Sequence, residues 1–226
     1  MRLYYMTAEK FALLILRERR LKISTIRELN DPFELLGASL GEKDMRHAMK
    51  ILHGHWSREL GMICLTDDWQ SPVMWAHYAD KHYGVCLAFD VSGPPGLINQ
   101  VHYVPDRLHD LLDQKEPLMG IDEGIIRQIL TTKFKDWAYE REYRLFAELK
   151  DRDPNGLYYL EFGPAIVLRE VIIGSRCSLD VNAIGSEIKD PPQSVEVFKA
   201  RPAFDSFRII RQQQVKPLIV ESPGQH

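Results

Sequence analysis

The stretch IVLREVIIG, residues 166–174, is rich in β-branched residues and has the length of a strand, and Gly174 ends it cleanly. Such stretches fill the second half of the chain, whereas most helical patterns fall in the first half. This separation predicts the α+β class, with a mixed or antiparallel sheet flanked by helices. The other strand-like stretches of the second half are residues 143–147, 157–162, 195–199 and 207–215.

The first half alternates short strands with helices. Residues 3–6, 62–65 and 85–89 are apolar runs of strand length, and Leu21 and Ile23 alternate with polar neighbours. The helical patterns predict one helix that Thr7 caps, one over residues 42–60, one that starts near Pro72, and one over residues 121–134.

Composition favours one soluble domain over residues 1–226, with a frayed tail at residues 222–226. The chain is 45% hydrophobic and carries a net charge of −3, which argues against a disordered protein and against broad non-specific binding of nucleic acid. The three cysteines do not suit a disulfide framework or a zinc knuckle. No signal peptide or membrane span is evident, so we expect a cytoplasmic location and no membrane partner.

Three segments concentrate the unusual polar residues, and the first is Asn30-Asp31-Pro32-Phe33-Glu34. Proline holds the preceding residue extended, so Asp31 can cap a helix that starts at Pro32, with Glu34 completing a capping box. This structural explanation leaves out Asn30, whose amide could face a ligand. The segment therefore predicts a rigid helix entry and a candidate binding pair, Asn30 and Asp31.

The second segment is MWAHYADKHYGVC, residues 74–86. The spacing of His77 and His82 does not place two imidazoles on one metal, so we expect no metal site. Aromatic rings with imidazole donors suit stacking on a base or nicotinamide, which makes Trp75, His77, Tyr78 and His82 candidate binding residues. The alternative is an aromatic plug between helix and sheet, which the pattern favours for Trp75 alone.

The third segment is WAYEREYR, residues 137–144. As a strand it would place Glu140, Glu142 and Arg144 on one face, whereas as a helix it would spread these charges around the axis. Two carboxylates so close raise each other's pKa unless Arg144 or a ligand compensates. An exposed edge strand would show the same alternation, so the segment predicts either a polar site or a solvated edge.

The three segments together resemble a bacterial family catalogued as domain of unknown function 2971. The resemblance extends over most of the chain and includes the opening Leu3-Tyr4-Tyr5. It implies a bacterial or phage source, with genes of phage defence or mobile elements nearby, and it carries no settled activity.

The order of motifs also resembles ADP-ribosyltransferases, which implies a split sheet and NAD as substrate, with no permanently bound cofactor. By this resemblance Tyr4 lies on the first strand, Glu142 stabilises an oxocarbenium-like transition state, and Glu140 orients the acceptor. The histidine or arginine usual on the first strand is displaced here, because Tyr4 and Tyr5 occupy its centre and only Arg2 is near.

These patterns support two hypotheses of function. The first is an enzyme that acts on NAD or another nucleotide, by ADP-ribosyl transfer or by glycohydrolysis, with a protein or nucleic acid as a candidate target. The second is a non-catalytic module that binds a ligand or partner in a phage-defence or toxin–antitoxin system. A nuclease using Asp31, His77, Glu140 and Glu142 is a weaker third, because no metal motif supports it.

Overall fold

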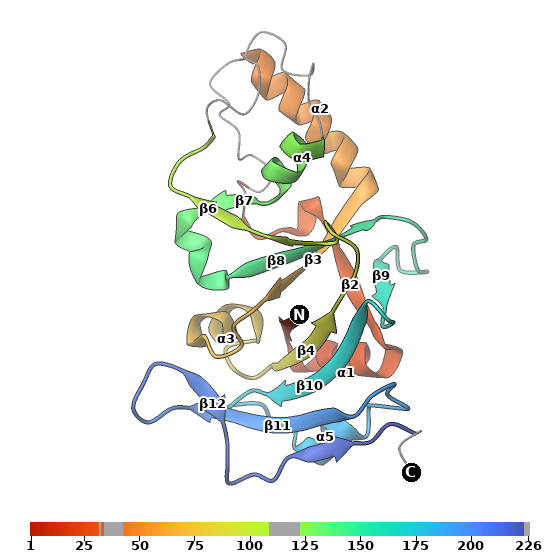
Figure 1. The fold of residues 1–226 in the computed structure, drawn as a ribbon, viewed down its shortest axis with the longest axis vertical. Helices are drawn as coiled ribbons and strands as arrows, with labels where there is room; N and C mark the ends of the chain where they lie inside the picture. The colour runs from red at the N-terminus through yellow and green to blue at the C-terminus, as the bar shows by residue number, and fades with distance from the viewer. Residues whose placement is uncertain (32, 34–42, 109–122, 224–226) are drawn as a thin grey trace.

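The computed structural model describes residues 1–31, 33, 43–108 and 123–223, and the fold is mixed α+β (Figure 1). Among these residues, eleven strands form one large mixed sheet. A separate parallel pair joins β6 (His102–Val104) to β7 (Thr132–Phe134). The α+β class and the mixed sheet expected from the sequence are therefore confirmed.

One half of the sheet is built around a fully buried strand. The apolar run 85–89 is buried on both faces, which explains its lack of polar alternation. Its strand pairs antiparallel with a neighbour on each side, and the only parallel pairing in the described part of this sheet lies one strand further out. The strands of this half are β1 (Arg2–Thr7), β4 (Val85–Val91), β10 (Ile166–Ile173), β11 (Val195–Pro202), β12 (Ile209–Arg211) and β13 (Leu218–Val220).

The other half joins the first through a single residue pair. Tyr4 of β1 stands opposite Thr66, and no other register pair links their two strands in the described chain. Because Thr66 is the last residue of β3, the two halves of the sheet are not joined along the length of these strands. The strands of this half are β2 (Arg20–Thr25), β3 (Leu60–Thr66), β5 (Ile98–Gln100), β8 (Glu142–Glu148) and β9 (Tyr158–Glu161).

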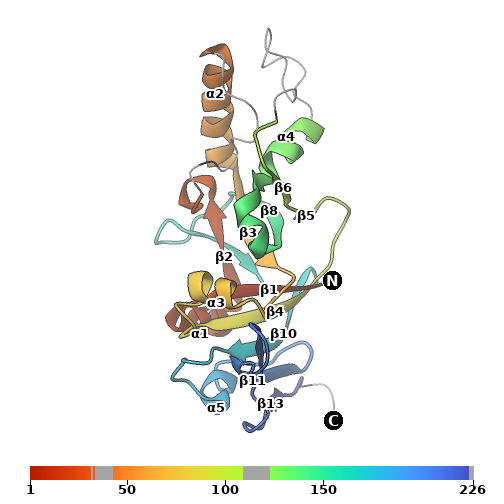
Figure 2. The same ribbon diagram turned by 90° about the vertical axis from the view of Figure 1, so that its left-hand side faces the viewer.

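The helices cover three separate parts of the core. Helix α1 (Glu9–Glu18) packs beside the sheet through Ala12, Ile15 and Leu16. Helices α2 (Lys43–Glu59) and α4 (Glu123–Leu130) form an apolar cluster at one end of the molecule (Figure 2). The helices are α1 (Glu9–Glu18), α2 (Lys43–Glu59), α3 (Pro72–Tyr78), α4 (Glu123–Leu130) and α5 (Val181–Gly185), with the 3-10 turns η1 (Ile26–Glu28) and η2 (Lys135–Glu140). No helix in the described ranges is both long and apolar enough to cross a lipid bilayer.

Several predicted boundaries are wrong. Thr7 is the last residue of β1, and α1 instead begins after Ala8, which offers no side-chain cap. The helix expected to reach residue 134 ends at Leu130, after which β7 takes up Thr132–Phe134. The strand expected over residues 207–215 is limited to β12, which covers Ile209–Arg211. Phe207 precedes the strand and is 97% exposed, so its ring does not pack on the sheet.

Candidate active site

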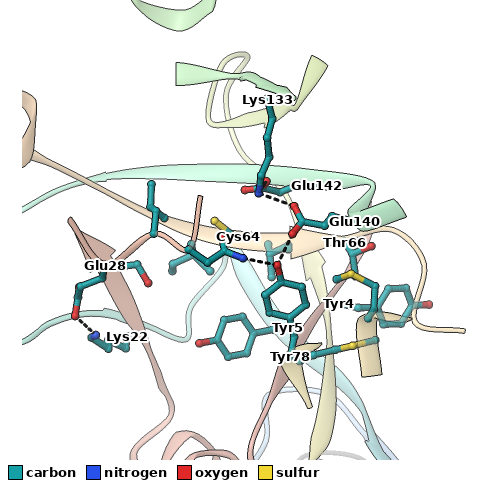
Figure 3. Close-up of a pocket in the computed structure, with 17 residues that line it drawn as sticks. Tyr4, Tyr5, Lys22, Glu28, Cys64, Thr66, Tyr78, Lys133, Glu140 and Glu142 are labelled. Atoms are coloured by element: carbon teal, nitrogen blue, oxygen red, sulfur yellow. Dashed lines mark hydrogen bonds and ion pairs between the residues drawn. The ribbon is translucent and has the colours of Figure 1, made fainter. Parts of the chain in front are cut away.

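A cavity of about 220 Å³ lies beside the point where β1 and β3 part (Figure 3). Tyr4 and Tyr5 of β1 line it, together with residues of β2 and β3 and the end of α3. Its opposite wall is polar and consists of Lys133, Glu140 and Glu142. The cavity therefore combines phenol rings with buried charged groups, the combination expected of a small-molecule site.

Lys133 joins the two carboxylates of this wall. Its Nζ lies 2.6 Å from Glu140 Oε2 and 3.2 Å from Glu142 Oε2. All three side chains are buried, Glu140 and Glu142 at 4% exposure each. Burying a charge is costly unless it is paired, so Lys133 supplies a shared positive partner to both carboxylates at the cavity wall.

Arg144 holds Glu142 from behind the wall. Its Nε donates to Glu142 Oε1 at 2.8 Å and one of its terminal nitrogens donates to Oε2 at 3.1 Å, which makes the pair bidentate. The guanidinium also donates to the carbonyl of Leu130 at 2.7 Å. Arg144 is fully buried and does not line the cavity, so its role is to fix Glu142.

Tyr78 connects the polar wall to the first segment. Its hydroxyl donates to Glu140 Oε1 and accepts a hydrogen bond of 2.7 Å from Nδ2 of Asn30 (Figure 3). The side chain comes from the last turn of α3, a helix that Pro72 and Ser71 start. Asn30, Tyr78 and Glu140 therefore form one hydrogen-bonded chain along the cavity.

The two carboxylates have opposite electrostatic character. Burial raises the pKa of Glu140, and Lys133 only partly offsets this effect. Burial acts in the same sense on Glu142, but Arg144 and Lys133 outweigh it and lower the pKa of Glu142 to about 2. Burial and the neighbouring Glu140 also raise the pKa of Tyr78, so its hydroxyl keeps its proton. Glu140 is thus the more basic carboxylate, and it accepts a hydrogen bond from the neutral Tyr78 hydroxyl.

The third segment is not one continuous strand. Residues Lys135–Glu140 form η2, and the strand β8 starts only at Glu142. Arg141 between them has φ 48° and ψ 47°, the left-handed conformation, so the alternation assumed from the sequence breaks at that residue. Glu140 and Glu142 meet at Lys133 because of this turn, and only Glu142 and Arg144 share a strand face.

The second segment contributes two residues to the cavity, Met74 and Tyr78, and only Tyr78 is one of its candidate binding residues. Trp75 is fully buried and donates through Nε1 to the carbonyl of Trp69 at 2.6 Å, in agreement with the aromatic-plug alternative. His82 stacks on the Trp75 ring with an interplanar angle of 9°. His77 is exposed, and its Nδ1 lies 3.0 Å from the Tyr139 hydroxyl. Trp75, His77 and His82 thus lie outside the lining, and Tyr78 lies within it.

The turn after α3 explains why this segment holds its shape. Asp80, Lys81 and His82 have φ of 46°, 53° and 72°, three consecutive left-handed residues. A Cβ at Gly84 would lie 2.1 Å from the Thr7 carbonyl oxygen, so only glycine lets the chain pass β1 there. The strained turn returns the chain to β4 directly and leaves Tyr78 at the cavity.

Only one of the two candidate residues of the first segment lines the cavity. Asn30 lines the cavity, while Asp31 is buried beside it and its Oδ1 accepts the Phe33 amide at 2.9 Å. The helix expected from Pro32, and Glu34 with it, lies outside the described residues.

Sequence reasoning missed several lining residues. Lys133 fell at the end of an expected helix, where nothing marked it as buried. Cys64 was not among the candidate site residues, but it is half-buried, lines the cavity and donates to Glu142. At the opposite side Lys22 and Glu28 form an ion pair. The alternation of β2 predicts that Lys22 projects from the other face of the strand than Leu21 and Ile23. It does not predict that this face borders a cavity.

Comparison with known proteins adds one family. Residues 74–145 match the model of a family described as Protein of unknown function (DUF2971). The match supports the resemblance drawn from the sequence. It includes Tyr78, Lys133, Glu140, Glu142 and Arg144. Tyr4 and Asn30 lie outside it. No curated protein and no solved structure matches the chain.

Proposed function

We propose that this cavity is an active site for a nucleotide-type small molecule, and that the protein cleaves the N-glycosidic bond of NAD or a related nucleotide. ADP-ribose would pass to water or to an acceptor, within an ADP-ribosyltransferase-like fold. The observation that carries the proposal is Glu140, a buried carboxylate that lines the cavity and is hydrogen-bonded to both Tyr78 and Lys133.

The size and lining of the cavity support part of a nucleotide as the ligand. At about 220 Å³ it is below the roughly 300–1,000 Å³ of pockets for drug-sized ligands. A nicotinamide with its ribose suits this space, and the remainder of NAD would extend beyond the mouth. Tyr4, Tyr5 and Tyr78 supply flat rings, and Asn30 supplies an amide.

The proposed reaction requires one carboxylate both to stabilise positive charge on the ribose and to accept a proton. As the bond between the ribose C1′ and the nicotinamide nitrogen breaks, its electron pair leaves with nicotinamide and positive charge develops on the sugar. A carboxylate beside the sugar stabilises that charge. The oxygen of water or of an acceptor then bonds to C1′, and its proton passes to the carboxylate.

Glu140 fits this role better than Glu142, to which the resemblance assigned the charge-stabilising part. Both oxygens of Glu142 are held by the permanent charge of Arg144, and its lowered pKa makes it a weak base. Glu140 has a raised pKa and a neutral hydroxyl on Oε1, which a substrate hydroxyl can replace. Glu142 and Arg144 then serve to hold Lys133 and, through it, Glu140.

The test is release of nicotinamide from NAD by the purified protein, with and without cell extract as a source of acceptor. We expect turnover by wild type and a loss of at least about 100-fold in Glu140→Gln. Glu148→Gln is the matched control, because Glu148 is an exposed carboxylate further along β8, and it should keep the wild-type rate.

Equal turnover by wild type and Glu140→Gln would remove the proposed role of Glu140. Loss of turnover confined to Glu142→Gln, with the fold intact, would return the role to Glu142. No turnover of NAD or of other nucleotides by wild type would refute the enzyme proposal itself.

The second candidate is a non-catalytic module that binds a ligand or partner in a defence or toxin–antitoxin system. What favours it is that each charged group of the polar wall has an opposite partner, as in a purely structural network. Cys64 gives a direct assay, because it lines the cavity whereas Cys86 and Cys177 are buried. If NAD slows alkylation of Cys64 by iodoacetamide in wild type and Glu140→Gln alike, and neither releases nicotinamide, the binding module is the correct function.

A further inference from the structure

A second cavity, of about 460 Å³, shares no lining residue with the first. It lies between the end of α1, the start of β10 and residues 188–193, which follow α5. Every segment of its lining is within the described chain, and its volume falls inside the roughly 300–1,000 Å³ of small-molecule sites.

The walls of this second cavity are mostly apolar. Leu16, Ile166, Leu168 and Ile188 are buried side chains that border it, and Phe162 adds a half-buried ring. Filling such a space with apolar atoms of a ligand removes their surface from water, at a gain of roughly threefold to fourfold in affinity for each buried CH₂.

Two cations stand at the second cavity, and its described lining contains no Asp or Glu. Lys189 is exposed, and its side chain makes no ion pair or hydrogen bond at contact distance among the described residues, although its charge helps to lower the pKa of the nearby Glu187. Arg19 donates through one terminal nitrogen to the carbonyls of Lys189 and Asp190, at 3.3 and 2.9 Å. Its Nε and its other terminal nitrogen have no partner in the part of the chain that is described.

Arg19 has a backbone conformation that is unfavourable for a residue with a side chain. Arg19 ends α1 in the left-handed conformation, with φ 54°, where glycine is the usual residue. A side chain there costs about 1 kcal/mol of backbone strain. Arginine at this position places a guanidinium at the mouth of an apolar cavity, with donors left over for an anion.

We propose that the second cavity binds a small monocarboxylic acid with an apolar chain. The chain would lie against Leu16, Leu168 and Ile188, and the carboxylate would accept hydrogen bonds from Arg19 and Lys189. This site is independent of the proposed reaction, and its test needs no turnover.

The experiment titrates the full-length protein with hexanoate, heptanoate and octanoate, and with octanamide as an uncharged match, by calorimetry. Methyl-labelled leucine and isoleucine residues report the location of the ligand by NMR. We expect the Kd to fall about threefold to fourfold per added CH₂. Shifts should centre on Ile166, Leu168 and Ile188, and octanamide should bind at least tenfold more weakly than octanoate.

Variants test the two cations separately. Lys189→Met should weaken octanoate binding about fivefold to tenfold with no change of fold, because Lys189 is exposed and its side chain is unpaired within the described residues. Arg19→Met should weaken it further. Lys10→Met, which removes an exposed cation at the other end of α1, should leave the Kd unchanged.

The proposal is overturned if octanoate does not bind, if its methyl shifts lie elsewhere, or if octanamide binds as tightly as octanoate. It is also overturned if Lys189→Met and Arg19→Met both leave the Kd at the wild-type value.

Discussion

The two segments that meet at Arg141 place equally buried carboxylates in opposite states. Glu140 ends η2, Glu142 begins β8, and each is 4% exposed and hydrogen-bonded to Lys133. The pKa of Glu140 is raised mainly by burial, whereas the pKa of Glu142 is lowered to about 2 because Arg144 outweighs burial. The partner, and not the degree of burial, decides the ionisation of each group.

The difference arises from the elements that carry the partners. Arg144 follows Glu142 by two positions on β8, so both side chains project from the same face of one strand. Tyr78 reaches Glu140 from α3, a distant element that provides a hydroxyl instead of a charge. A regular strand thus holds the inert carboxylate, and a turn holds the one suited to chemistry.

The largest expected effect comes from removing the partner on the strand side. Arg144→Met leaves Glu142 buried without its bidentate cation, so the free energy of unfolding should fall by about 3–5 kcal/mol in urea denaturation. Arg141→Met is the matched control, because Arg141 pairs with Asp67 at the surface, and it should cost no more than about 1 kcal/mol. Similar losses in the two variants would contradict the conclusion that the buried pair of Arg144 and Glu142 stabilises the fold more than a surface pair does.

The dependence of stability on pH should separate the two carboxylates. Glu142 has a lowered pKa in the folded state, so its contribution is present above its ordinary value of 4.5 and is lost as pH falls towards 2. This loss amounts to roughly 3 kcal/mol. Glu140 has a raised pKa, so its contribution has the opposite sign: it is present at low pH and is lost as pH rises through the folded-state pKa.

Urea denaturation of wild type and Glu142→Gln between pH 2.5 and 6 measures the difference. The variant should lose less stability on acidification, and Glu140→Gln should lose at least as much as wild type. If Glu142→Gln follows the wild-type curve at a constant offset, the lowered pKa of Glu142 is wrong.

The smallest effect concerns the junction itself. Arg141 is left-handed, a conformation that glycine adopts freely and β-branched residues resist. Both Arg141→Gly and Arg141→Val lose the ion pair with Asp67, so their difference isolates the backbone. Arg141→Val should be less stable than Arg141→Gly by about 1–2 kcal/mol in urea denaturation. Equal stabilities would mean that the turn is not constrained at this residue.

Local pattern was sufficient for the strands and helices whose signals are strong. The apolar runs of β4 and β10 and the proline start of α3 are found where the sequence predicted them. Prediction failed where long-range contacts override local preference. His77 and His82 were candidate binding residues but lie outside the cavity lining, and residues 137–144 looked like one strand but bend at Arg141.

The sequence by itself determined the α+β class and a set of candidate site residues. Of that set, Tyr4, Asn30, Tyr78, Glu140 and Glu142 line the cavity, whereas Asp31, Trp75, His77, His82 and Arg144 do not. Periodicity and residue type are local properties, so they can be read without a fold. Only the tertiary structure brought Lys133 to both carboxylates, placed Arg144 behind Glu142, and opened a cavity where β1 and β3 share one residue pair. These features depend on contacts between residues far apart in the chain, and both the burial and the charged partners that shift the two pKa values exist only once those contacts have formed.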